Sequence, residues 1–520
     1  MSTASSTATS RQRRPFDSWL HRGPFVARDL AIFRIICGVL LLATQERFQW
    51  IDGIPNSFYD PPPGPFQLLT GFPQGGFFAI LGIALVVTTF AMTIGIATRW
   101  SSIAVTLLLI TGYGFEYSFG KVEHSILIAI APAILSFSNW GAQLSVDSLL
   151  RRSAAPPIRQ WALRAFAIAI GVSFSTAAYV KIASGWLSSK TQVAQTYFLQ
   201  AQDSGGSRNF VTQFALSTHG AGLWESVDWA TIAFEVLMSI AFISWRLLRV
   251  AVAIATLFHL SIYFLLGIQF DWNVIAYGAF VSWNIVPLPH LAATARRVLM
   301  IVGLVALAAL ALTTGYWVAG PFNHDAPDFA VPILYVGAII GAGYLVWLVV
   351  RGIRRPMVLA PIVPPGTGVR ILAIVAAIVL VLASPAGLFI KHAKGEPYPA
   401  LFQPGFDAPG PQAQGRIIAQ SVHIEVTLSN GSVHKLMTSQ AIPHTGLQGT
   451  VFQDGFHRPS ADISPETKAW LAAWLDAQFA PLRATRMTAI WENVKYNRQT
   501  GAITYKSIGQ TTTVILNSDG

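Results

Sequence analysis

Four ionisable residues lie inside stretches of otherwise apolar sequence, where a charge is costly. Arg34 lies in AIFRIICG, Lys181 in AAYVKIASGW, Glu235 in TIAFEVLM and His259 in TLFHLSIY. Ionisable side chains within apolar membrane segments are rare, and they commonly serve binding, pairing or proton transfer. A lysine, a glutamate and a histidine can each carry a proton, so these residues are the first candidates for chemistry.

A second group of polar residues falls where apolar stretches begin or end. Glu116, Glu123, His124 and Asp271 have such positions, and Lys181 lies near the end of its own stretch. We expect all of these ends to lie on the outer side of a membrane. They can therefore line one polar pocket open to that side, and the small residues before Lys181 leave room for a ligand.

Each candidate also has a purely structural interpretation. Lys181 can extend to lipid headgroups, and Arg34 can hold backbone carbonyls. Glu235 and His259 lie at similar depth on sequential stretches, so we predict that they approach each other, with or without chemistry. His124, at the start of a helix, can simply donate to a loop. The direction of the Lys181 side chain separates the structural interpretation from the functional one.

The composition predicts that these residues are positioned by membrane helices. The chain has 520 residues, 53% of them hydrophobic and only 11% charged, whereas soluble domains carry about 25% charged residues. A membrane-spanning helix needs about 20 mainly apolar residues, and about eleven stretches qualify, two of them weakly. The clear ones begin near Leu30, Gly76, Ser101, Arg164, Trp229, Ala251, Arg297, Val331 and Arg370. The two weak ones, which are short, begin near His124 and Asp271.

The loops between these stretches alternate in charge. Arginines gather in the basic tail at 1–29 and then in every second loop, while the intervening loops hold most of the acids. By the positive-inside rule, the N-terminus is cytoplasmic and the C-terminal region lies outside a cell membrane. The net charge of +11 comes without a basic stripe interleaved with aromatics. The lipid bilayer is therefore the expected partner, and nucleic acid is not.

The region after Lys391 changes character. A Pro/Gly-rich segment predicts a linker, and an Asn-Gly turn at 430–431 predicts a hairpin. Ser464 and Pro465 predict the start of an amphipathic helix. We therefore divide the chain into the tail, a helical domain at 30–290, three further helices at 291–391, and a small extracytoplasmic α+β domain at 392–520. From about residue 410, that domain is predicted to fold alone.

The histidines of this domain do not predict a metal site. No pair of them has the spacing of a recognised ligand set, so solvated surface histidines are expected and no metal is predicted. They are His423, His434, His444 and His457.

Five short segments, in order, carry a resemblance to a known family. They are Phe33-Arg34 with Gly38, EHSILIAI followed by SVD at 145–147, AYVKIASGW, Phe234-Glu235, and FHLSIYFLLGIQFDW. Together they resemble the horizontally transferred transmembrane (HTTM) domain family over residues 30–290. The best-understood branch of that family is the vitamin K-dependent γ-glutamyl carboxylase.

The resemblance implies a reaction and two roles. In the carboxylase branch, a lysine in this element deprotonates a vitamin K hydroquinone, and oxygen then converts it to an epoxide through a strong base. That base removes a γ-proton from a glutamate, and the carbanion takes up carbon dioxide. Lys181 matches the lysine, and His124 matches a histidine that assists near the substrate. The implied cofactors are thus a reduced quinone and O2, with CO2 for a carboxylase, and no metal.

The sequence departs from the family pattern at three points. Val122-Glu123 replaces a pair of asparagines, the lysine is single, and Asp271 replaces a proline. Glu123 would tend to keep His124 protonated and to repel an acidic substrate. Quinone-linked proton abstraction is therefore expected more than glutamate carboxylation. The alternative is a non-catalytic maturation or export factor that binds a secreted polypeptide; no internal repeat favours a transporter.

Overall fold

Structural statements below concern the residues that the computed structural model describes. These are 15–44, 48–119, 125–203, 209–218, 220–285, 302–312, 330–354, 359, 366–403, 405–408, 416–436, 441, 463–497 and 502–516.

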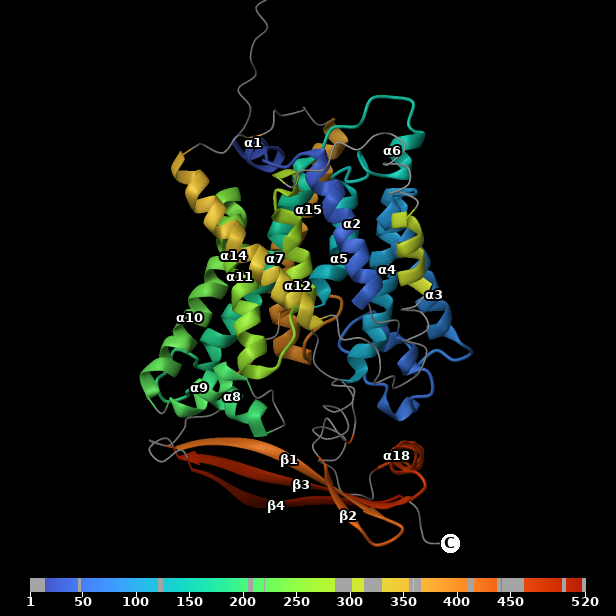
Figure 1. Ribbon diagram of the computed structural model, residues 1–520, viewed down its shortest axis with the longest axis vertical. Coiled ribbons are helices and arrows are strands. Elements are labelled where there is room, and N and C mark those ends of the chain that lie inside the picture. The colour runs from blue at the N-terminus through green and yellow to red at the C-terminus, as the bar shows by residue number, and fades with distance from the viewer. Residues whose placement is uncertain are drawn as a thin grey trace, which may run out of the picture.

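The chain forms a helical bundle with a sheet below one of its ends (Figure 1). Helices α1 (Pro15–His21) and α6 (Val146–Leu150) lie at one end of the bundle, and the four-stranded sheet lies beyond the opposite end. The helices between these ends are α2 (Ala27–Thr44), α3 (Phe77–Ile94), α4 (Thr98–Glu116), α5 (Ile126–Ser136), α7 (Gln160–Ser184), α8 (Val193–Asp203), α9 (Phe210–Ser217), α10 (Ala221–Ile240), α11 (Trp245–Leu266), α12 (Asp271–Tyr277), Val302–Leu312, α14 (Ala330–Arg354) and α15 (Thr367–Lys394).

Six of the described helices are long and apolar enough to cross a membrane. They are Phe77–Ile94, Thr98–Phe119, Gln160–Ser184, Trp245–Leu266, Val331–Arg351 and Thr367–Lys394. The predicted count of about eleven spans stays a prediction. The stretch at Asp271 corrects it in part, because α12 has 7 residues, or about 10 Å of helix against a core of about 30 Å.

The other weak stretch also forms a short helix. Helix α5 has 11 residues with Pro132 inside it. Most residues of α5 and all but one of α12 are buried. Short helices at membrane depth persist where neighbouring protein satisfies their ends, so these two act as internal elements that connect the longer helices.

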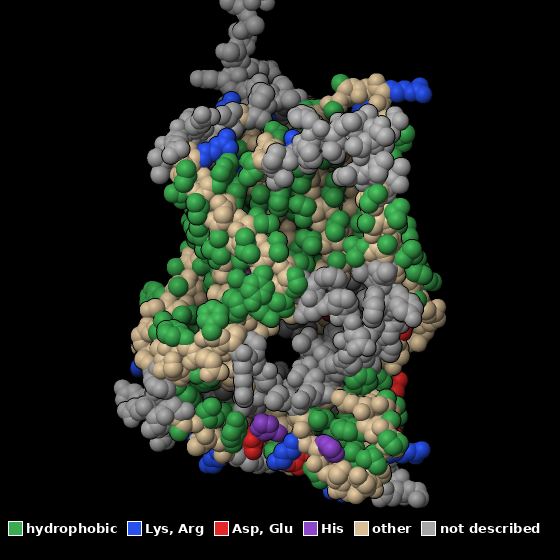
Figure 2. All heavy atoms as spheres, in the orientation of Figure 1, with side chains coloured by type: hydrophobic (Ala, Val, Ile, Leu, Met, Phe, Trp, Pro, Cys, Tyr) green, Lys and Arg blue, Asp and Glu red, His purple; other side chains and the backbone are tan. Residues whose placement is uncertain are grey.

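The surface of the bundle is apolar between its two ends. Hydrophobic side chains cover this band, while charged side chains gather at the end that carries α1 and α6 and over the sheet (Figure 2). Exposed side chains in the band include Ile80, Val87 and Ile339, each more than half exposed. Exposed apolar side chains arranged in a band around helices are typical of a surface that faces lipid.

The sheet contains the hairpin predicted around Asn430-Gly431 and two further strands of the predicted α+β domain. Its order is β2-β1-β3-β4, all antiparallel, with bounds β1 (Arg416–Leu428), β2 (Val433–Leu436), β3 (Ala484–Asn497) and β4 (Ile503–Ile515). Gly431 has φ +80° in the β1–β2 turn, and the Asn430 side chain accepts from Ser432 N. Helix α18 (Pro465–Phe479) begins as predicted, because Ser464 Oγ accepts from Thr467 N.

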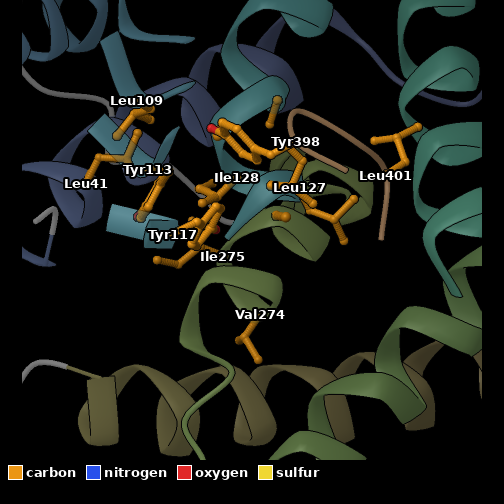
Figure 3. Close-up of a cluster of buried hydrophobic side chains, with 14 of the residues drawn as sticks. Leu41, Leu109, Tyr113, Tyr117, Leu127, Ile128, Val274, Ile275, Tyr398 and Leu401 are labelled. Atoms are coloured by element: carbon orange, nitrogen blue, oxygen red, sulfur yellow. The ribbon is translucent and has the colours of Figure 1, made fainter. Parts of the chain in front are cut away.

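The segment predicted as a linker is instead packed into the bundle, and we call residues 398–403 and 405–408 the strap. Tyr398 is 2% exposed, and its hydroxyl donates to Ile110 O at 2.7 Å. Figure 3 shows Tyr398 and Leu401 among side chains of the bundle such as Leu127. The strap ties the sheet to the helices, so the expectation of a free linker is wrong.

The sheet domain also contacts the bundle directly. Ser57 Oγ lies 2.8 Å from Thr467 Oγ1, and the ring centroids of Phe58 and Trp470 are 5.6 Å apart. Tyr496 of β3 joins a buried cluster with side chains of α8, α9 and α10. That the domain folds alone stays a prediction, and these contacts would be exposed in the isolated domain.

The orientation inferred from the arginines can be tested with cysteine labelling. The only cysteine, Cys37, is fully buried, which gives a low background. In intact cells, Lys435→Cys in the sheet should react with a membrane-impermeant maleimide. Arg152→Cys at the opposite end should react only after permeabilisation. The reverse pattern, or labelling of both in intact cells, would contradict the orientation.

Candidate functional site

Lys181 forms a buried ion pair. It lies one turn before the end of α7, and its Nζ is 2.7 Å from Glu235 Oε1 on α10. The two side chains are 3% and 7% exposed. Both charges have therefore left water, which costs several kcal/mol per ion before the pairing offsets it. The lysine points into the protein, so its interpretation as a lipid-headgroup anchor is wrong.

Aromatic rings surround this ion pair. Lys181 Nζ lies 5.3 Å from the ring centroid of Trp186 and 5.6 Å from that of Phe406. Cation–π attraction within about 6 Å contributes most when the cation is desolvated. Glu235 Oε2 is buried and has no hydrogen-bond partner among the described residues. This oxygen is thus available to accept a proton or a ligand donor.

His259 lines the same cavity as Glu235, which agrees with the predicted approach, but its hydrogen bond goes elsewhere. His259 Nε2 lies 2.9 Å from the Tyr277 hydroxyl on α12. The His259 ring also stacks on Phe270, with centroids 4.6 Å apart and planes at 12°. Glu235 pairs with Lys181 instead, so three helices bring a lysine, a carboxylate and an imidazole to one place.

The space between these groups is a small cavity of about 100 Å³. Besides Lys181, Glu235 and His259, its lining is mainly aromatic and aliphatic and includes Phe174, Trp186, Tyr197, Phe198, Trp224, Phe258, Phe270, Gln403 and Phe406. A cavity with aromatic walls and few polar groups is typical of a site that binds a flat, largely apolar ligand.

The strap closes one side of the cavity. Trp186 Nε1 donates to Phe406 O at 2.7 Å, and Asn273 Nδ2 donates to Gln403 Oε1 at 3.1 Å. Gln403 N also approaches Thr176 Oγ1 at 3.4 Å. The small residues before Lys181, expected to leave room for a ligand, are therefore covered by the strap, and the room lies on the Glu235 side.

The strap's outer end is held by a tyrosine of α8. Tyr197 lines the cavity, and its hydroxyl donates to Asp407 O at 2.8 Å. Burial, with the Asp407 carboxylate as a second cause, raises the pKa of the Tyr197 phenol to about 12. The phenol therefore remains a hydrogen-bond donor at neutral pH.

The other predicted site residues lie elsewhere or outside the described part of the chain. Arg34 donates to Trp140 O at 3.1 Å and to Leu144 O, near α6 and away from the cavity lining. Asp271 is buried at the first residue of α12, next to Phe270 but not itself a lining residue. Glu123 and His124 lie outside the described residues.

No group of three or more possible metal-ligating side chains is found in the part of the chain that the structure describes. On the sheet, His423 Nε2 lies 3.0 Å from Glu492 Oε2, and His434 Nε2 lies 3.3 Å from Ser432 Oγ. His444 and His457 are outside the described residues.

The position of Arg34, away from the cavity lining, predicts that its replacement lowers stability without abolishing activity. Replacing Arg34 with methionine should destabilise the protein by about 2–4 kcal/mol, because two buried carbonyls lose a charged donor. Thermal unfolding in detergent measures this. Arg152→Met, an exposed site at the same end, serves as control. Equal stability of both variants would contradict the structural role.

The strap predicts a change in access to the cavity. A Cβ on Gly405 would lie 2.7 Å from Val180 Cγ1, so Gly405→Val should lift the strap from α7. A cysteine at Gln403, which is 4% exposed, should then react with a soluble maleimide at least about tenfold faster, since local opening governs access. Gly343→Val, where a Cβ meets open space, should leave the rate unchanged. An unchanged rate in Gly405→Val would contradict the closing role.

Comparison with known proteins identifies one family. The model of the HTTM domain family matches residues 23–283, half of the chain. The match covers Lys181, Glu235 and His259, and it ends before α14, α15 and the sheet. No curated protein and no solved structure matches the chain.

Proposed function

Because the chain belongs to the HTTM domain family, and with its long apolar helices is a multi-pass membrane protein, we propose that it is a quinol- and oxygen-dependent enzyme. The reaction class is proton abstraction coupled to oxidation of a reduced quinone. Carbon dioxide is a further substrate if the chemistry follows the carboxylase branch. The single observation that carries the proposal is Lys181, a lysine buried in an aromatic cavity and within 2.7 Å of a carboxylate.

The side chains around the cavity have distinct roles in this proposal. When bound, a quinol supplies two electrons and an acidic hydroxyl. Lys181 Nζ accepts the hydroxyl proton after its own proton has moved to Glu235 Oε1, along their hydrogen bond. Apolar surroundings disfavour both charges of the pair, so the neutral pair is accessible. Trp186 and Phe406 line the cavity beside Lys181 Nζ and would exclude water from it.

His259 and Tyr277 support a second proton route. The imidazole faces the cavity, and its Nε2 shares a proton with the Tyr277 hydroxyl. This side chain can therefore exchange a proton with a substrate without contact with bulk water. Helix α8, which lines the cavity, lies toward the end of the bundle that faces the sheet (Figure 1). A polypeptide substrate would approach from that side. With the arginine-based orientation, that side is extracytoplasmic.

Oxygen uptake by the purified protein tests the proposal. The full chain is reconstituted in liposomes with a reduced naphthoquinone, and oxygen consumption and quinone products are measured. The proposal expects turnover above protein-free liposomes. Turnover that rises with added bicarbonate and labels a polypeptide with ¹⁴C would place it with the carboxylases. No turnover with either naphthoquinols or benzoquinols would contradict the enzyme.

The alternative, a non-catalytic maturation or export factor, has its own supporting observation. Strand β4 is at the edge of the sheet, with Ile503 45% exposed and Tyr505 53% exposed. An exposed edge strand can pair with an extended polypeptide by strand addition. Asn497 N donates to Ala502 O, so the alternate residues Ile503 and Tyr505 direct their amides away from β3. Tyr505→Pro would remove one of these edge amides; loss of client binding with quinol turnover unchanged would favour this second function.

A further inference from the structure

A second and larger cavity lies on another side of the bundle. Its volume is about 460 Å³, and it is formed by α2, α11, α12 and α14. The walls are almost wholly apolar, with Phe33, Leu40, Ile275 and Val336 among them. Val336 is also 56% exposed on the face of α14 that belongs to the lipid-facing band. An apolar cavity of this size excludes water and is filled by apolar ligands.

One side of this cavity is polar. The Tyr344 hydroxyl, on a lining side chain that is 5% exposed, has no hydrogen-bond partner among the described residues. A buried phenol without a partner is costly. A phenol hydroxyl can donate and accept, and the arginines near it can only donate. An acceptor such as an ester or phosphate oxygen would therefore use the proton of the Tyr344 hydroxyl, which no described group accepts.

The charges near Tyr344 are mainly positive. Arg249 and Tyr344 are close enough to interact electrostatically, as are Arg249 and both Asp29 and Arg351. Asp29 already accepts from two backbone amides. Arg351 stacks over Trp347 at 4.7 Å, one turn beyond Tyr344. Two arginines against one carboxylate leave a net positive charge beside the unpaired phenol.

The polar side lies toward the end of the bundle that carries α1. Arg249 stacks over Phe25, which precedes α2, and its Nη2 donates to Ser282 Oγ at 2.8 Å. The Lys181 cavity faces the opposite end. An amphiphile in the larger cavity would thus place its headgroup at one membrane surface and its chain along the bundle.

We propose that this cavity binds an acyl chain of an anionic glycerophospholipid. The chain fills the apolar walls, an ester or phosphate oxygen accepts a hydrogen bond from Tyr344, and the headgroup charge pairs with Arg351. Polybasic contacts favour anionic lipids at a membrane surface. The inference is independent of quinol chemistry, because it uses a different cavity and different side chains.

Native mass spectrometry of the full chain, released from nanodiscs of equal phosphatidylglycerol and phosphatidylcholine, tests the proposal. The wild type should retain one phosphatidylglycerol after detergent washing. Ile340→Trp, which fills the cavity, should reduce the retained fraction at least about fivefold. Ile339→Trp is the matched control, since Ile339 is 71% exposed and outside the lining, and it should retain the lipid as the wild type does.

The headgroup part is tested by Tyr344→Phe and Arg351→Gln. Both should lower the preference for phosphatidylglycerol over phosphatidylcholine at least about threefold while some lipid is still retained. Equal retention in Ile340→Trp and Ile339→Trp would overturn the cavity as the site. Equal retention of phosphatidylglycerol and phosphatidylcholine by the wild type would overturn the proposed selectivity for an anionic headgroup. The same conclusion would follow if Tyr344→Phe and Arg351→Gln both kept the wild-type preference for phosphatidylglycerol.

Discussion

Lys181→Ala is expected to lower quinol-dependent oxygen uptake by at least about 100-fold, because general acid–base catalysis contributes about 10²–10⁴-fold. The side chain is the basic group nearest to Glu235 in the aromatic cavity. The measurement is the initial rate of oxygen consumption in proteoliposomes at saturating quinol. Lys190→Ala, exposed at the same end of the bundle, should retain the wild-type rate.

The variant Lys181→Arg distinguishes a role of Lys181 as a base from a role as a positive charge. Guanidinium stays protonated near neutral pH and cannot accept a proton, so this variant should remain as inactive as Lys181→Ala. Full activity in Lys181→Arg would show that the lysine only supplies a charge to Glu235. The enzyme proposal would then lose its main support.

The ion pair also predicts a large effect on stability. Glu235→Leu should destabilise the protein by about 3–5 kcal/mol, because the lysine is left buried without its counter-charge. The double variant Lys181→Met/Glu235→Leu should regain most of that loss, since an apolar pair of similar volume replaces both charges. Thermal unfolding in detergent, with the four proteins of the cycle measured together, gives the coupling energy.

The same cycle distinguishes stability from catalysis. Lys181→Met/Glu235→Leu should unfold near the wild-type temperature and yet show no quinol turnover. Removing the solvent-exposed pair Lys435–Glu425, whose side chains are 80% and 30% exposed, should change the unfolding temperature little. A stable double variant with wild-type turnover would contradict the catalytic role of the pair.

The helical bundle was largely predictable, because the length and composition of apolar stretches indicate membrane-spanning helices. The six long helices coincide with predicted stretches, and the two weak stretches became the short helices α5 and α12. Their shortness also followed from the sequence, and short helices at membrane depth are expected to pack against protein or a wet cavity. The helices that surround them were not predictable. Burial depends on which helices surround them, and one sequence does not encode that arrangement in its hydropathy.

The sequence identified the residues of the candidate site, but it did not identify which of them form hydrogen bonds with each other. Depth along a helix placed Glu235 and His259 at one level, but it could not state which face each side chain takes. The structure pairs Glu235 with Lys181 across α10 and α7, and His259 with Tyr277 of α12. Lys181 had been placed at the outer interface by counting residues, whereas the strap covers that end of α7 and buries it.

The strap was missed because proline and glycine dominate its composition. A linker was the natural prediction from those residues. Its four large apolar side chains were the available signal, since a solvated linker seldom needs them: Tyr398, Leu401, Phe402 and Phe406. All four are buried or line the cavity. Spaced aromatic residues in a Pro/Gly-rich segment after the last membrane helix therefore indicate packing.

A structure of the purified protein with a bound reduced naphthoquinone tests the central claim most directly. We predict density for a flat ring between Trp186 and His259, with one hydroxyl within hydrogen-bond distance of Lys181 Nζ. Gly405→Val gives a second sample in which access to the same cavity is widened. Quinone density that lies only in other parts of the bundle, with the cavity beside Lys181 empty in both samples, would contradict it.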